Sequence, residues 1–100
     1  MIDEKFRKAL DNLAEERELE ILRLDNPSFD NSVVGLTEDG RLVYDYAKMV
    51  RELHKDDKIS MLDAMEFIDY NTLRALPYKG DRAPIIVMET KKEILMRYGE

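Results

Sequence analysis

The only histidine of the chain, His54, is the first residue to consider as a catalytic base, because the ordinary pKa of histidine, about 6.5, lies near neutral pH. It stands late in a predicted helix, and nothing beside it in the sequence is typical of a nucleophile. The 100 residues contain no cysteine, which excludes a disulfide framework, a thiolate zinc site and a cysteine nucleophile. We therefore interpret His54 as an exposed helix residue and predict that the chain is not an enzyme.

Three acidic residues, Asp63, Glu66 and Asp69, recur at intervals of three along a predicted helix and are the best candidates for metal ligands. Carboxylates one helical turn apart can share a hard divalent cation. Such a helix normally works with a histidine or a further inward acid from a facing helix, and neither is evident here. A calcium-binding loop over residues 25–36 is excluded, because Leu36 stands where that loop requires glutamate. We expect a solvated acidic face, with no metal and no cofactor.

Motifs that bind phosphate or DNA are also missing. The four glycines are too far apart for a glycine-rich phosphate loop. Two predicted helices, over residues 46–55 and 60–76, have the spacing of a helix-turn-helix. The second helix carries the three acids named above against Arg74 alone, so the phosphates of DNA would repel it. We expect no direct reading of DNA.

Charge is unevenly distributed along the chain, whose net charge is −6. Residues 1–30 hold nine acidic and five basic residues, whereas residues 74–97 hold six basic and three acidic ones. An acidic chain disfavours binding to a phosphate backbone, which depends on clustered lysine and arginine. The alternative is a small regulator that contacts nucleic acid through its basic C-terminal third. Salt-sensitive binding that is lost on charge reversal at Lys91, Lys92 and Arg97 would favour that alternative.

Hydrophobic periodicity and turn residues predict the elements that position these side chains. A helix is expected over about residues 3–24, with its apolar stripe drifting after Arg17, where it ends, bends or changes partner. A turn-rich loop follows over residues 25–32. Strands over 33–36 and 41–44 form a hairpin, because Asp39 and Gly40 suit a turn that ends in a left-handed residue.

The second half of the chain predicts three helices and one strand. Asp45 is expected to cap the helix over 46–55, and Ser60 the helix that ends before Pro77. A turn over 78–81 leads to a strand over 85–88. A last helix, capped at Glu89 or Thr90, has an apolar side formed by Ile94, Leu95 and Tyr98.

The strand over 85–88 reads Ile-Ile-Val-Met and does not alternate between apolar and polar residues. Both of its faces should therefore be covered, as in the middle of a sheet with helices on each side. A second subunit is the other source of one covering layer. The expected fold is a single α+β domain over residues 1–100, in the order α-β-β-α-α-β-α, with a small three-stranded sheet packed by helices.

Four tyrosines, Tyr44, Tyr46, Tyr70 and Tyr78, cluster around the ends of the central elements. Tyrosine is common at binding hot spots, and it also closes the rim of a core while its hydroxyl meets water or backbone. We identify Tyr70, Asn71, Arg74 and Tyr78 as the candidate interaction face. The alternative is a structural role at the end of the helix before Pro77.

Two stretches carry a family resemblance: Gly35–Tyr46, which reads GLTEDGRLVYDY, and Ala64–Tyr78, which reads AMEFIDYNTLRALPY. With the APII stretch that follows, they resemble small uncharacterised proteins of gut-type Gram-positive bacteria and of their phages or mobile elements. The resemblance covers about residues 33–87 and leaves the first helix outside. It implies a coherent fold and a bacterial cytoplasmic setting, and it transfers no catalytic residue.

The N-terminus carries charges where a signal peptide needs an apolar segment, and the longest apolar run is far below the roughly 20 residues that span a bilayer. We therefore expect a cytoplasmic protein with no membrane contact. The hypothesis that remains after these exclusions is a non-enzymatic interaction or accessory module of a bacterium, phage or mobile element. Its partner would be another protein or a second copy in a homodimer.

Overall fold

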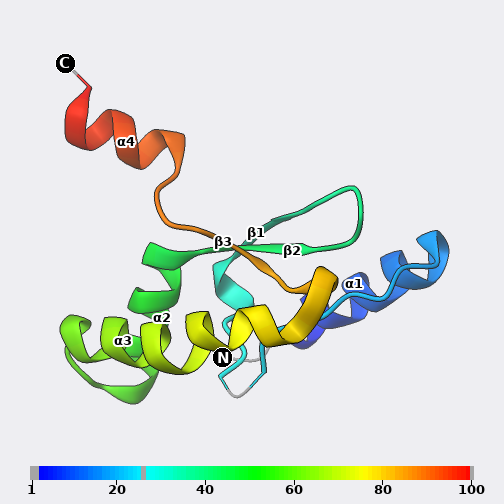
Figure 1. Cartoon of the computed structure of the whole chain (residues 1–100), viewed down its shortest axis with the longest axis horizontal. Coiled ribbons are helices and arrows are strands. Elements are labelled where there is room, and N and C mark those ends of the chain that lie inside the picture. Colours follow the sequence, from blue (N-terminus) through cyan, green and yellow to red (C-terminus); the bar gives the residue numbers. More distant parts are fainter. Residues whose placement is uncertain (1–2, 26, 100) are drawn as a thin grey trace.

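The computed structural model describes residues 3–25 and 27–99, and within them it confirms the predicted α+β fold and the order of its elements (Figure 1). Residue 26 of the predicted loop lies outside the described residues. The helices and strands are α1 (Glu4–Arg17), β1 (Val33–Leu36), β2 (Leu42–Asp45), α2 (Tyr46–Asp57), α3 (Met61–Phe67), β3 (Ile85–Val87) and α4 (Lys91–Tyr98). The other helical segments are the 3₁₀ turn η1 (Asp30–Ser32), the π-helical turn η2 (Ile68–Thr72) and the ten-residue 3₁₀-type segment η3 (Leu73–Arg82).

Side-chain caps fix the starts of three helices as the sequence predicts. Asp45 accepts a hydrogen bond from the backbone N–H of Lys48, and Ser60 accepts one from Asp63. At α4, Thr90 and Glu93 each accept a hydrogen bond from the other's backbone N–H, which forms a complete capping box. These caps satisfy amide groups that a helix leaves without partners at its N-terminus.

The first helix ends earlier than the expected limit near residue 24. Glu18 adopts the left-handed conformation, with φ of 54°, and the N–H of Leu19 bonds to the carbonyl of Ala14. This is a helix-terminating arrangement that glycine usually supplies, so no residue type marks it in the sequence. Residues 19–25 then run back beside α1 and bring Leu24 into the core.

The sheet has the order β1-β2-β3, so β2 lies in the middle and β3 at an edge. Within one chain, the strand over 85–88 is therefore not fully covered on both faces in the way that its unbroken apolar run predicts. Residues 85–87 are only half-buried and Met88 is 51% exposed. β1 pairs antiparallel with β2 through the hairpin, whereas β3 pairs parallel with it because α2, α3 and η3 form a crossover between the two strands.

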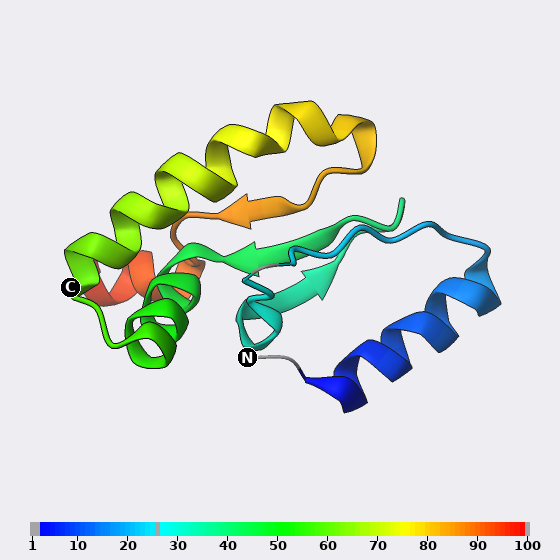
Figure 2. The same cartoon turned by 90° about the horizontal axis from the view of Figure 1, so that it is seen from below.

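The helices cover the sheet unequally. Figure 1 shows the sheet nearly edge-on, with α2 and α3 below it and α4 above, away from the other helices. Figure 2 shows α3 and η3 beside the β3 edge and α1 beside the β1 edge. The core lies on the side of α2 and α3, and its members are Leu10, Leu24, Phe29, Leu42, Tyr44, Tyr46, Met49, Val50, Leu53, Ala64 and Ile68.

The helical segment that begins with α3 continues past Pro77, contrary to the expected end before that residue. It changes to a π-helical turn over η2 and then to a 3₁₀-type segment over η3, in which only Gly80 leaves helical geometry. Proline fixes φ near a helical value and lacks only an N–H, so a loosely hydrogen-bonded segment accommodates it. The predicted turn over 78–81 lies inside this segment, where Gly80 (φ 80°, ψ −159°) breaks the helical geometry.

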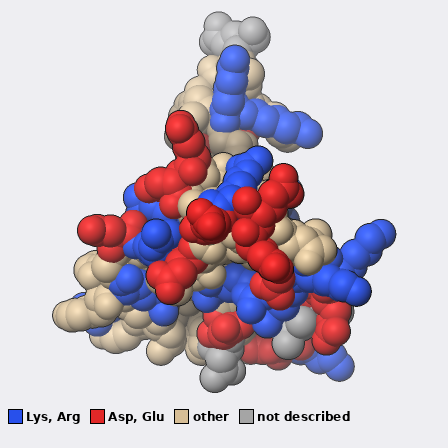
Figure 3. All heavy atoms as spheres, turned by 90° about the vertical axis from the view of Figure 1, so that its right-hand side faces the viewer, with Lys and Arg blue, Asp and Glu red and all other residues tan. Residues whose placement is uncertain are grey.

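Acidic and basic side chains alternate over the side of the molecule where α1 and the hairpin lie (Figure 3). This face has no single-sign field of the kind that guides a polyanion over a wide surface. Charge complementarity on this face therefore has to be sought locally.

Candidate functional site

The four residues of the predicted interaction face, Tyr70, Asn71, Arg74 and Tyr78, are all exposed along η2 and η3. The side chain of Tyr78 is 91% exposed and that of Tyr70 is 69% exposed. The guanidinium of Arg74 lies over the ring of Tyr70, 4.5 Å from its centroid. Asn71 donates a hydrogen bond to the carbonyl of Phe67, one turn earlier in the helix. The face is thus a solvent-facing aromatic and basic stripe.

The two other tyrosines have structural roles. Tyr44 is fully buried, and its hydroxyl accepts a hydrogen bond of 2.9 Å from the backbone N–H of Leu24. Tyr46 donates a hydrogen bond of 3.0 Å to the carboxylate of Asp69. Burial raises the pKa of each hydroxyl to about 12, and at Tyr46 the bond to Asp69 adds to the effect. These tyrosines close the core and do not form a surface with Tyr70 and Tyr78.

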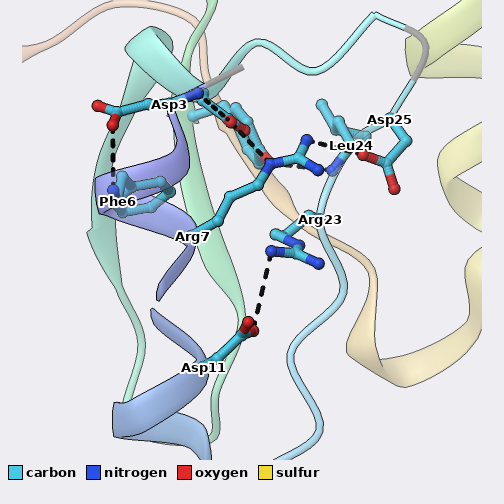
Figure 4. A network of polar contacts seen from close by, with 9 residues as sticks. Asp3, Phe6, Arg7, Asp11, Arg23, Leu24 and Asp25 are labelled. Atoms are coloured by element: carbon cyan, nitrogen blue, oxygen red, sulfur yellow. Dashed lines mark hydrogen bonds and ion pairs between the residues drawn. The ribbon is translucent and has the colours of Figure 1, made fainter. Parts of the chain in front are cut away.

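The most buried charged group is Asp30, which belongs to a polar network at the start of α1 (Figure 4). Its Oδ2 atom accepts hydrogen bonds from the Arg7 guanidinium, at 2.9 Å, and from the backbone N–H of Asp3, at 3.0 Å. Arg7 also bonds to Asp25 at 2.8 Å, and these bonds raise the pKa of Arg7. The network ties α1 to residues 25–30, and we assign it a structural role.

Helix α4 is the main unpartnered element of the described chain. None of its eight residues is buried, although its cap is complete. Its predicted apolar side is open to solvent: Ile94 is 46%, Leu95 56% and Tyr98 70% exposed. Lysines and an arginine flank this side at positions 91, 92 and 97. The sequence therefore predicted the helix and its apolar side, but not that the side lacks a partner within the chain.

A second exposed apolar area lies on the outer face of α3. Met61, Leu62 and Met65 are all exposed there, while Ala64 and Ile68 of the same helical segment are fully buried. Leu62, Met65, Glu66 and Asp69 follow the spacing i, i+3, i+4 and i+7, which places them on one helical face. Acidic and apolar side chains therefore share this outer face.

A groove of about 710 Å³ separates α4 from α2 and β1. Four of the residues that line it are basic: Lys48, Arg51, Lys92 and Arg97. The two acids that line it, Asp45 and Glu93, accept hydrogen bonds from the backbone at the starts of α2 and α4. The bases of α4 belong to the basic C-terminal third that the sequence indicates, whereas Lys48 and Arg51 on α2 were not predicted as part of a basic site. Their spacing of three along a helix was the available signal.

The catalytic and metal-binding candidates find no site in the described part of the chain. His54 is exposed, and its Nδ1 atom pairs with the backbone carbonyl of Ile59. No three histidine or carboxylate side chains among the described residues are placed to hold a metal ion. Within the same residues, no helix is long and apolar enough to cross a membrane.

Comparison with known proteins gives no family. Neither a protein-family model, nor a curated protein, nor a solved structure matches the chain. The function of the protein is therefore inferred from the surfaces described above.

Proposed function

We propose that this protein is a non-enzymatic interaction module that binds another polypeptide through α4. The observation that carries the proposal is that α4 is fully formed and capped yet buries none of its residues. An isolated helix of fewer than about 12 residues is marginal in water, because nucleation is costly and few hydrogen bonds repay it. A short helix with an exposed apolar side gains its stability when that side docks.

The aromatic and basic stripe of Tyr70, Asn71, Arg74 and Tyr78 supports the same class of function. Tyrosine and arginine are the residues that most often dominate protein–protein binding energy. We assign this stripe to a partner contact rather than to the end of the helix. Alanine at Asn71 and Arg74 should leave the melting temperature nearly unchanged and weaken partner binding; a large loss of melting temperature would instead favour the structural role.

The resemblance of residues 33–87 to small proteins of Gram-positive bacteria and their phages or mobile elements suggests the setting. In that setting the protein acts in the cytoplasm as an accessory factor. The exposed apolar sides of α3 and α4 fit such a role, because patches of this kind on a small domain mark interaction sites.

The second candidate function is nucleic-acid contact, and the groove between α2 and α4 is the observation in its favour. Lys48 and Arg51 add to the basic C-terminal third that the sequence indicates. The groove also contains two carboxylates, and the whole chain is acidic, so we rank this function second. Oligonucleotide binding that falls steeply with salt and is lost in a Lys48→Glu, Lys92→Glu variant would move it to first place.

The direct test of the proposed function is site-specific photocrosslinking in cells. A photoreactive amino acid replaces Leu95 on the apolar side of α4, and a control places it at Glu15, an exposed position of α1. We expect a polypeptide adduct from position 95 in excess over position 15. Equal labelling at the two positions would overturn the assignment of α4 as the binding element.

A further inference from the structure

We infer that the partner of α4 is a second copy of this chain, and that α4 of each copy docks on the outer face of α3 of the other. The inference rests on the proposed function of α4 and adds the identity of its partner. It is carried by the complementarity of two exposed surfaces within one chain. Two such contacts close a dimer when a two-fold axis relates the two copies.

The charges of the two surfaces are opposite. The apolar side of α4 is flanked by Lys91, Lys92 and Arg97, with Glu93 held in the capping box. The outer face of α3 carries Asp63 and Glu66, which are exposed. Asp69 on η2 is exposed as well, but it already accepts a hydrogen bond from Tyr46. Opposite charges around an apolar contact favour this pairing and disfavour the pairing of like helices.

The apolar parts of the two surfaces also match in kind. Ile94, Leu95 and Tyr98 would pack against Leu62 and Met65. Methionine is flexible and adapts to irregular partners, so the Met61–Met65 part of α3 is suited to receive a helix. Both helices lie toward the same end of the molecule, at the left in Figures 1 and 2.

Alternative occupants are less well supported. The acidic residues of α3 would repel a polyanion. An acidic peptide would complement only the basic flanks of α4. A second copy satisfies both surfaces at once.

Charge reversal with rescue tests this inference on the full chain, with mass measured by light scattering over a range of concentrations. We expect wild-type protein to reach twice the 11.8 kDa mass of the chain. K91E/K92E and D63K/E66K should each weaken association by at least about tenfold, and the four substitutions combined should restore it. K8E, a charge reversal on the exposed face of α1, serves as control and should associate like wild type.

Three results would overturn the inference: a monomer at all concentrations, a dimer that the α3 reversals do not affect, or equal loss of association in the K8E control. A failure of rescue in a correctly folded combined variant would also count against it. A monomeric wild-type protein whose position 95 still crosslinks to a different polypeptide would leave the proposed function in place and remove only the second copy as partner.

Discussion

At the scale of single residues, the clearest division is between tyrosines that hold the fold and tyrosines that face solvent. Tyr44 and Tyr46 have buried hydroxyls with named partners, whereas Tyr70 and Tyr78 are exposed. The sequence places all four near the ends of the predicted central elements, and residue type does not distinguish the buried pair from the exposed pair. Their burial does, because a buried hydroxyl needs a hydrogen-bond partner within the fold.

The buried tyrosines predict a loss of stability at alkaline pH. In the unfolded chain tyrosine titrates near pH 10, and in the folded chain the pKa of Tyr44 and of Tyr46 is raised to about 12. The folded state holds these protons more tightly, so the stabilisation is complete below pH about 10 and is lost as the pH rises toward about 12. The melting temperature, measured across this range, should fall accordingly.

Phenylalanine variants give this prediction its control. A Y44F/Y46F variant should show a shallower alkaline decline, although its stability near neutral pH is lower because the N–H of Leu24 loses its acceptor. Y78F, at an exposed position, should follow the wild-type profile. A double variant with the full wild-type decline would show that other groups cause it.

The second prediction at this scale concerns the stability that the polar network at the start of α1 provides. Arg7→Met removes the guanidinium that pairs with the buried carboxylate of Asp30, whose Oδ1 atom already lacks a partner among the described atoms. The free energy of unfolding should fall by about 1.5–3 kcal/mol, the usual cost of losing a hydrogen bond to a charged group.

Arg23→Met is the matched control for this prediction. Arg23 lies 3.8 Å from the exposed carboxylate of Asp11, and its loss should cost less than about 1 kcal/mol. Both values come from denaturant titration at one protein concentration. An equal loss of unfolding free energy in the two variants would contradict the stabilising role that we assign to the pairing of Arg7 with Asp30.

At the scale of elements, the sequence predicts helix starts well because caps are local. Asp45, Ser60 and Thr90 each mark a start through a side chain that reaches only three residues along the chain. The end of α1 is different, because Glu18 takes a left-handed conformation that its residue type does not announce. The passage of η3 through Pro77 is likewise a property of a loosened helix rather than of proline itself.

Strand order and the state of α4 depend on contacts that no local pattern encodes. The apolar run at 85–87 indicates a strand, but its place at an edge beside β2 follows from the path of the crossover helices. The spacing of Ile94, Leu95 and Tyr98 indicates which side of α4 is apolar. It cannot indicate whether that side contacts this chain or another.

The two helices differ in what they contribute to the stability of one chain. Ile68→Ala, at a fully buried position where the segment from α3 continues, should cost about 2–5 kcal/mol of unfolding free energy. Leu95→Ser on α4 should change that free energy by less than about 0.5 kcal/mol, since the side chain is already in solvent. Denaturant unfolding of dilute protein measures both, and a large cost for Leu95→Ser would mean that α4 packs within its own chain.

At the scale of the whole molecule, association depends on local complementarity rather than on total charge. Two copies that each carry −6 repel at long range, but physiological salt screens that repulsion beyond about 8 Å. Contacts between the basic flanks of α4 and the acids of α3 act at shorter range. In the proposed dimer, these short-range contacts would therefore have to outweigh the long-range repulsion.

The measurement that tests the central claim most directly is amide hydrogen exchange in α4 at low protein concentration. The claim is that α4 docks on another polypeptide and not on its own core. We predict rapid exchange of the amides over residues 91–98 in dilute protein, well above that of α2, and protection when the partner is bound. Slow exchange in α4 at the lowest concentration, comparable to that of α2, would show that α4 packs within its own chain and would contradict the claim.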